Sequence, residues 1–289
     1  MTNESVKDKI FRYTITGFLC AAAVISLLPL ITVLATSLSS RAAVNMNSVT
    51  LIPKEFTLAS WKYILSYKDL WRSFAITLAS TVIGTFLALL VNSLMAYPLS
   101  KGDFGPGKVI MMGIVLTMIF KAPTVPYFLT LRGMSLFNNA LVLVLPHLIS
   151  AYNLSIMRTF FKQFPAEVEE AATIDGCGAF RLLFKIVLPS SMAVLATIGL
   201  FYAVTIWNQF QHPLMFIQDP KLFPLQLKIR QLIDDGSVLK AVMTDASANY
   251  NDRTLRAATV IFAIIPIIAV YPYLQKYFAK GAMLGSVKG

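Results

Sequence analysis

Long apolar stretches alternate with shorter polar connections along the whole chain. A helix needs about 20 mostly apolar residues to cross a hydrocarbon core of roughly 30 Å. Six stretches meet this requirement, and we predict a transmembrane helix for each. The expected ranges are 15–37, 73–99, 108–129, 139–160, 190–216 and 255–274. The pattern therefore predicts an all-α membrane protein, with residues 1–289 forming one transmembrane domain.

Prolines and small residues modify this simple pattern. Residues 121–126 read Lys-Ala-Pro-Thr-Val-Pro in the third span, and Pro146 lies inside the fourth. A proline removes a backbone donor and kinks or ends a helix. In the second span Ser80, Gly84 and Ala88 recur at every fourth residue, a spacing that lets two helices approach closely. We expect broken spans and one close helix contact, with chance composition as the alternative for the small residues.

The charges flanking the first span predict the orientation. Three basic residues precede this span, whereas only Arg41 closely follows it. Because basic residues favour the cytoplasmic side, and six spans bring both ends to one side, we predict cytoplasmic termini. Residues 161–189 then lie in the cytoplasm, and residues 38–72 and 217–254 form long outer loops.

The composition agrees with a membrane protein and argues against nucleic-acid binding and metal binding. Charged residues make up 13% of the 289 residues, against roughly 25% in soluble domains. The formal net charge is +11, but basic residues occur on both predicted sides, so no single nucleic-acid-binding patch is expected. The two cysteines and two histidines are not spaced as metal ligands, and we predict no metal site.

The residues argue against three other functions: nucleotide binding, secondary transport and catalysis within the membrane. Residues 102–108 fit GxxxxGK, but Val109 replaces the Ser or Thr that a phosphate-binding loop uses for magnesium. A short turn explains this segment, and we expect no cofactor on the chain. A secondary transporter needs acidic residues in its spans, and the six ranges contain none. A membrane enzyme needs a nucleophile, metal cluster or acid–base pair at depth, and no such motif appears.

The connection at residues 161–189 carries the clearest local pattern. Pro165 suits the first turn of a helix, and three glutamates follow where the helix dipole favours negative charge. Gly176 can adopt the left-handed conformation that ends a helix, and a second short helix is expected to end at Pro189. We predict a helix–turn–helix that docks into a groove of a partner, with a plain interfacial connector as the alternative.

The same connection resembles the signature loop of ABC-importer permeases. The pattern E-A-A-x3-G-x9-I-x-L-P is matched by Glu170, Ala171, Ala172, Gly176, Ile186, Leu188 and Pro189. The resemblance implies the type I importer fold, in which this loop, with Asp175, forms a cytoplasmic coupling helix held in a cleft of the ATPase. It also implies that this chain is a transport subunit and no enzyme, with ATP and Mg bound by a separate ATPase.

Further segments resemble the second, six-helix permease subunit of carbohydrate importers related to the maltose permease. They are Trp207–Phe210 and the tail Gly285, Ser286, Val287, Lys288 and Gly289. Residues 157–161 and 272–278 resemble a subgroup of these importers that serves complex oligosaccharides such as alginate and pectin fragments. It implies a homologous second permease, two ATPases, an extracytoplasmic sugar-binding protein and the bacterial inner membrane, with the tail lying between the ATPases.

Polar residues of the fifth span are candidates for the substrate path. They are Tyr202, Thr205, Trp207, Asn208 and Gln209. Polar groups in a bilayer must face protein or water, so these residues either line the path or bond to other helices. Helical spacing places Tyr202, Thr205, Gln209 and, less squarely, Asn208 on one face.

Lys121 is a charge within the third span. Its ammonium either reaches water at the outer membrane surface or faces the path and meets an acidic sugar. We expect an oligosaccharide as cargo, acidic if Lys121 faces it; a neutral small sugar or a glycerol-phosphate-like solute is the alternative. Outer-loop charges that we expect to meet the binding protein are Asp219, Lys221, Asp234 and Asp235.

Overall fold

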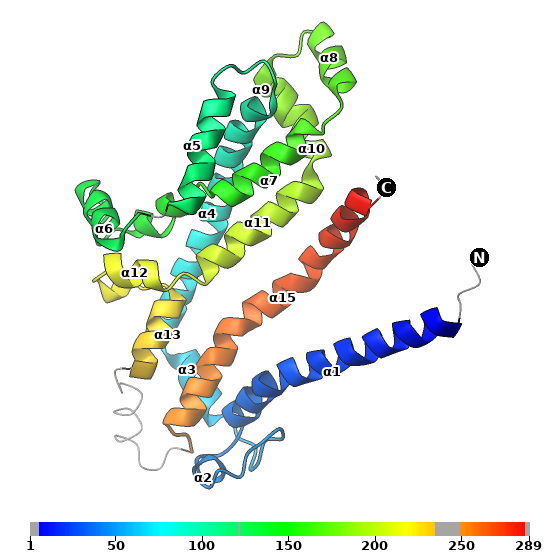
Figure 1. Ribbon diagram of the computed structural model, residues 1–289. Coiled ribbons are helices and arrows are strands. Elements are labelled where there is room, and N and C mark those ends of the chain that lie inside the picture. The colour runs from blue at the N-terminus through cyan, green and yellow to red at the C-terminus, as the bar shows by residue number, and fades with distance from the viewer. Residues whose placement is uncertain (1–5, 121, 235–248, 287–289) are drawn as a thin grey trace. The chain divides into compact units, whose positions relative to one another are not determined.

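The computed structural model describes residues 6–120, 122–234 and 249–286 (Figure 1). Every regular element in these ranges is a helix, and no strand occurs among them. The predicted all-helical class is therefore confirmed. Three helices are long and apolar enough to cross a membrane: α1 (Val6–Ser37), α4 (Lys68–Ser100) and the part of α15 (Asp252–Ser286) up to Val270.

Two bent pairs of helices add candidate spans. Ala140–His147 is followed by Ala151–Lys162 at an angle of 46°, and Ala179–Ser190 by Met192–Trp207 at 85°. The apolar helix α5 (Gly107–Ile119) is shorter than a full span. The number six remains a prediction, because only three described helices have the length of a span without a break.

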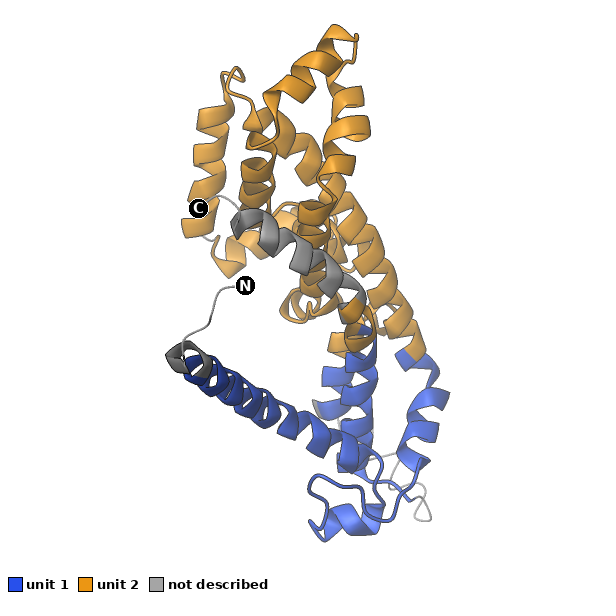
Figure 2. Cartoon of the chain, turned by 90° about the vertical axis from the view of Figure 1, so that its right-hand side faces the viewer, with its two compact units in different colours: residues 1–70, 229–266 blue, residues 71–228, 267–289 orange. Residues whose placement is uncertain are grey.

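The described chain divides into two compact units (Figure 2). Unit 1 comprises residues 1–70 and 229–266, and unit 2 comprises residues 71–228 and 267–289. Shorter helices outside the broken spans are α2 (Arg41–Asn45), α3 (Ala59–Ser66), η4 (Pro220–Leu222) and α13 (Leu225–Asp234).

Side-chain hydrogen bonds order the loop 38–72 in unit 1. The indole Nε1 of Trp61 donates to Ser37 Oγ over 3.2 Å, which ties α3 to the end of α1. The amide of Asn251 donates to Asn45 Oδ1 over 2.7 Å, which ties α2 to the start of α15. The predicted outer loop thus contains the short helices α2 and α3, which hydrogen bonds hold to α15 and α1.

A buried cluster forms the core of unit 2. It joins α4, α7 (Ala151–Lys162), residues 172–187 and α11 (Met192–Trp207). A Cβ added to Gly84 would lie 2.7 Å from Ile206 Cδ1, and one added to Gly199 would lie 3.2 Å from Leu89 Cδ1. One glycine on each helix therefore permits α4 and α11 to pack closely, and the close contact predicted at Gly84 is confirmed.

The predicted spans break where polar residues and prolines occur. The third is divided into α5 and α6 (Thr124–Gly133). The fourth is not a helix from residue 139, because two short 3₁₀ turns, η1 (Ala140–Leu143) and η2 (Leu145–His147), precede α7. The helix expected over 190–216 stops at Trp207, and α12 (Gln211–Phe216) follows a non-helical link.

Candidate functional site: the coupling segment

Residues 166–190 form the coupling segment, the helix–turn–helix predicted between the fourth and fifth spans. Its first helix, α8 (Ala166–Ile174), follows Pro165 and ends at a complete hydrogen-bonded cap. Gly176 has a φ of +77°; its N–H donates to Thr173 O, and the N–H of Cys177 donates to Ala172 O over 2.9 Å. Only glycine adopts this conformation without strain, which confirms the predicted role of Gly176.

The second part of the coupling segment leads into the buried cluster of unit 2. It consists of α9 (Ala179–Leu182), the π-helical turn η3 (Leu183–Val187) and α10 (Leu188–Ser190). Pro189 lies in α10, directly after the π-helical turn, and the helical run ends one residue later at Ser190. Leu183 and Val187 are buried, and Ile186 and Leu188 pack against the same cluster. This half of the motif therefore anchors the segment to unit 2.

The exposed side chains of the coupling segment are both apolar and acidic. Ile174 is 86% exposed and Phe180 is 74% exposed. Glu170 and Asp175 are exposed on the same segment, whereas Ala172 is buried in the core. Large exposed apolar side chains mark interaction sites. The geometry thus divides the motif into a buried anchor and a surface fit for docking.

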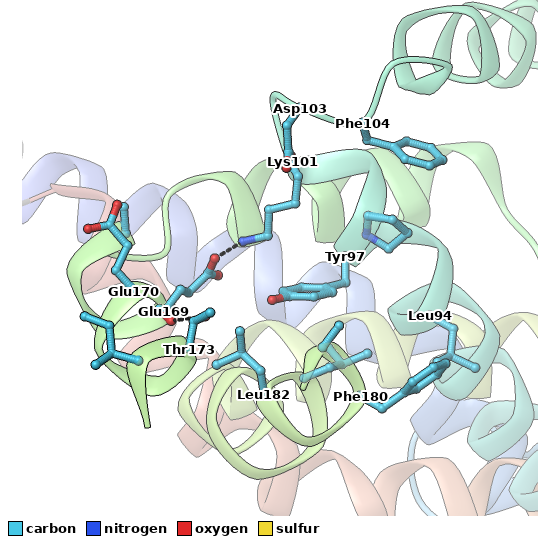
Figure 3. Close-up of a pocket in the computed structure, with 15 residues that line it drawn as sticks. Leu94, Tyr97, Lys101, Asp103, Phe104, Glu169, Glu170, Thr173, Phe180 and Leu182 are labelled. Atoms are coloured by element: carbon cyan, nitrogen blue, oxygen red, sulfur yellow. Dashed lines mark hydrogen bonds and ion pairs between the residues drawn. The ribbon is translucent and has the colours of Figure 1, made fainter. Parts of the chain in front are cut away.

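A cavity of about 1050 Å³ lies between the end of α4 and the coupling segment (Figure 3). The residues that line it are Leu94, Tyr97, Pro98, Lys101, Asp103, Phe104, Ala166, Glu169, Glu170, Thr173, Ile174, Ala179, Phe180, Leu182 and Leu183. Most of these side chains are apolar, and the charged ones are Lys101, Asp103, Glu169 and Glu170.

An ion pair in this cavity joins α8 to the residue that follows α4. The ammonium of Lys101 bonds to Glu169 Oε2, and the side chains are 28% and 16% exposed (Figure 3). Lys101 Nζ also lies 4.6 Å from the centroid of the Tyr97 ring, a cation–π arrangement. Sequence reasoning did not select Lys101, because a basic residue just after a span is common and nothing in the pattern pairs it with α8.

The polar residues of the fifth span do not share one face. Tyr202, Trp207 and Gln209 are buried, whereas Thr205 and Asn208 are exposed. The helical spacing argument fails for Gln209, because α11 has ended at Trp207. Tyr202 Oη accepts a hydrogen bond from the Ser150 N–H over 2.9 Å, and Gln209 Nε2 donates to Leu143 O over 3.2 Å. Their role in the substrate path stays a prediction.

Two histidines that are distant in sequence meet where the spans are broken. The rings of His147 and His212 have centroids 5.1 Å apart, and Tyr127 Oη lies 2.9 Å from His212 Nε2. The sequence offered one signal only, since each residue lies in a segment interrupted by proline. In the described ranges no group of three or more potential metal-ligating side chains occurs.

Several predicted site residues lie outside the described part of the chain. They are Lys121, Asp235, Val287, Lys288 and Gly289. Gly285 and Ser286 are in the last turn of α15, and the side chain of Asp234 is not described. Asp219 Oδ1 accepts the N–H of Lys221 over 2.8 Å and thereby caps η4.

Three comparisons relate the chain to known proteins. A family profile described as binding-protein-dependent transport system inner membrane component matches residues 106–283. The polygalacturonan/rhamnogalacturonan transport system permease protein YtcP of Bacillus subtilis (strain 168) is 38% identical over 98% of this chain and 100% of its own. Protein LplC of the same organism is 38% identical over 94% of this chain and 92% of its own.

A solved structure is similar in both sequence and fold. It is described as the crystal structure of a bacterial ABC transporter involved in the import of the acidic polysaccharide alginate. Its matching chain is 32% identical to this one, with a TM-score of 0.90 over 96% of this chain and 100% of the other.

Proposed function

The chain belongs to the family of binding-protein-dependent transport system inner membrane components, and from that premise we propose that it moves an acidic oligosaccharide into a bacterial cell. At a coarser level it is the multi-pass inner-membrane permease of a sugar ABC importer, a transport subunit and not an enzyme. A permease of this kind works with a binding protein and an ATPase.

The cargo proposal rests on the relatives and on one residue of this chain. The relatives are named for polygalacturonan and for the acidic polysaccharide alginate. Lys121 supplies a cation within the third predicted span. An ammonium on the path would attract a carboxylate of the sugar, and this attraction would be strong in a region of low dielectric. A neutral small sugar or a glycerol-phosphate-like solute remains the alternative cargo.

The assembly proposed for this chain contains a homologous second permease, two ATPase subunits and an extracytoplasmic binding protein. Both termini are cytoplasmic in this assembly, and residues 285–289 lie between the ATPases. ATP and Mg belong to the ATPases, and this chain holds no cofactor. The half-buried Asp219 and the exposed Lys221 belong to the outer surface that meets the binding protein.

The coupling segment supports the mechanism of alternating access. Its exposed side chains, among them Ile174, Phe180 and Glu170, sit in a cleft of the ATPase. Closure of the ATPases around ATP displaces α8, and the buried anchor at Leu183 and Val187 passes the movement to α11. Rigid-body movement of this kind opens one side of a transporter as it closes the other. The single observation that carries the proposal is this division between docking face and anchor.

Reconstitution tests the proposal. The chain is placed in liposomes with the second permease, the ATPases and the binding protein, and uptake of acidic and neutral oligosaccharides of equal length is compared. We expect uptake that requires ATP and favours the acidic sugar. A preference for the neutral sugar supports the alternative cargo, and uptake without ATP contradicts the importer mechanism.

A further inference from the structure

We propose that Lys101 is a positioning residue whose ion pair with Glu169 makes the end of α4 follow every movement of α8. The inference rests on the proposed function, because it assigns a second connection to the same coupling segment. The juxtaposition that carries it is an ammonium at the end of a membrane-spanning helix, held against a carboxylate of the docking helix (Figure 3).

The pair is sheltered enough to hold the two elements together. The side chain of Glu169 is only 16% exposed, and the Oε1 atom of this carboxylate has no hydrogen-bond partner within the described residues. The carboxylate therefore depends on Lys101 for its bond. Removing one partner of a sheltered pair leaves a charge that is poorly solvated, so the pair is harder to open than one at the surface.

Tyr97 fixes the position of the ammonium. Its ring lies 4.6 Å from Lys101 Nζ, and it packs edge-on against Phe161 with centroids 6.4 Å apart. The guanidinium Nε of Arg158 donates to Leu99 O over 2.7 Å, which binds the last turn of α4 to α7. The Lys101 ammonium is thus held beside the packed core that α4 and α7 form.

Two neighbouring glutamates of α8 have different surroundings. Glu169 points toward Lys101, whereas Glu170, the first residue of the motif, points away from it and is exposed (Figure 3). We assign Glu170 to the surface that meets the ATPase and Glu169 to the attachment of α8 to α4.

Three connections then join α8 to the spans. The chain leads from α8 back to α7 through residues 163–165, and onward through α9 and η3 to α11. The ion pair leads directly to α4, which α8 otherwise reaches through α7, by the hydrogen bond from Arg158 to Leu99 O and by packing between buried side chains. With all three connections intact, α4 moves together with α7 and α11 when α8 moves. Without the pair, α4 follows α8 less closely than α7 and α11 do, and ATP hydrolysis proceeds with less transport.

The first test measures the ATP hydrolysed per sugar imported by the complete importer in liposomes. The variants are Lys101→Met, Glu169→Gln and the double exchange Lys101→Glu with Glu169→Lys. Each single variant is expected to raise the ratio about fivefold or more. The double exchange is expected to bring the ratio back toward the native value, a rescue that a purely structural role of either residue would not produce.

Lys162→Met is the matched control, because Lys162 is an exposed lysine at the end of α7. Its ratio should equal that of the native importer. An unchanged ratio in Lys101→Met, or a double exchange as poorly coupled as the single variants, overturns the proposal. Absence of ATP-dependent uptake by the native importer instead contradicts the proposed function.

A second measurement reports on the pair without any transported sugar. Spin labels replace Leu94 on α4 and Val168 on α8, in a complex whose Cys20 and Cys177 are changed to serine. The distance between the labels should be the same with and without ATP when Lys101 is present, and should change with ATP in Lys101→Met. A change with ATP in the presence of Lys101 overturns the proposal.

Discussion

At the scale of single residues, the motif of the coupling segment contains groups with opposite tasks. Ala172 is buried and Ile186 packs against the same core, so these residues hold the segment in place. Glu170 and Asp175 are exposed and free to meet a partner. Gly176 serves neither task directly. Its left-handed conformation reverses the chain between α8 and α9 and so sets the shape of the surface proposed to meet the ATPase.

We predict that Gly176→Val uncouples ATP hydrolysis from uptake. A β-branched residue in the left-handed region costs about 1–2 kcal/mol, which favours opening of the cap at the end of α8. Gly178→Val is the control, because Gly178 has a φ of −71° and, like Gly176, no atom within 4 Å of an added Cβ. The ratio of ATP hydrolysed to sugar imported is measured for both variants. Equal ratios in the two would contradict the role of Gly176.

Lys121 provides a prediction about substrate charge. If its ammonium faces the path, Lys121→Ala removes an attraction that only an acidic sugar experiences. Uptake of an acidic oligosaccharide should then fall more than uptake of a neutral one of the same length. The measurement is a comparison of initial uptake rates, with Lys121→Arg as the variant that retains the charge. An equal loss for both sugars shows that Lys121 does not select for charge.

At the scale of elements, unit 2 depends on close packing between helices and on hydrogen bonds at the points where helices are interrupted. The contact between α4 and α11 is made possible by Gly84 and Gly199, which face large side chains of the opposite helix. The break before α7 is stabilised by Tyr202, whose hydroxyl accepts the backbone N–H of Ser150. Within a bilayer, no water is available to bond to that N–H if the Tyr202 hydroxyl is removed.

We predict that Gly84→Val destabilises unit 2. An added Cβ alone would lie 2.7 Å from Ile206 Cδ1, and overpacking of this kind costs about 1–3 kcal/mol. Gly113→Val in α5 is the control, since an added Cβ there meets nothing within 4 Å. Thermal unfolding in detergent should show a lower midpoint for Gly84→Val only. Equal unfolding midpoints for the two variants would contradict the close packing of α4 against α11 at Gly84.

Tyr202→Phe tests the hydrogen bond at the break before α7. The substitution keeps the ring but leaves the N–H of Ser150 unpaired, at a cost of about 1–3 kcal/mol. Tyr152→Phe is the control, because Tyr152 is 56% exposed. A lower unfolding midpoint in Tyr202→Phe with unchanged sugar specificity would place Tyr202 in the framework. Altered specificity with an unchanged midpoint would place it in the substrate path.

At the scale of the whole molecule, much apolar surface has no cover within the described chain. In the most apolar window of α1, only 6% of the residues are buried. A helix that is apolar on all sides faces lipid or other protein. The proposed second permease would cover part of this surface.

We therefore expect the second permease to stabilise this chain. Binding of a partner to the folded state alone raises its apparent stability. The unfolding midpoint in detergent should be higher for the purified pair of permeases than for this chain alone. A permease from an unrelated importer serves as the control, and an equal effect from it would contradict a specific interface.

The sequence by itself determined the helical class, three long apolar helices and the helix–turn–helix of the coupling segment. These follow from local rules: apolar length, proline, and a glycine at a helix end. The motif also determined the family, because its spacing is long and every position is matched.

Only the tertiary structure decided which side chains meet. The ion pair of Lys101 with Glu169 and the contact of His147 with His212 join residues far apart in the chain. Periodicity assigns a side chain to a face only while the helix continues. It therefore failed at Gln209, which lies beyond the end of α11. Contacts across the fold depend on how the helices pack against one another, and no local pattern encodes that arrangement.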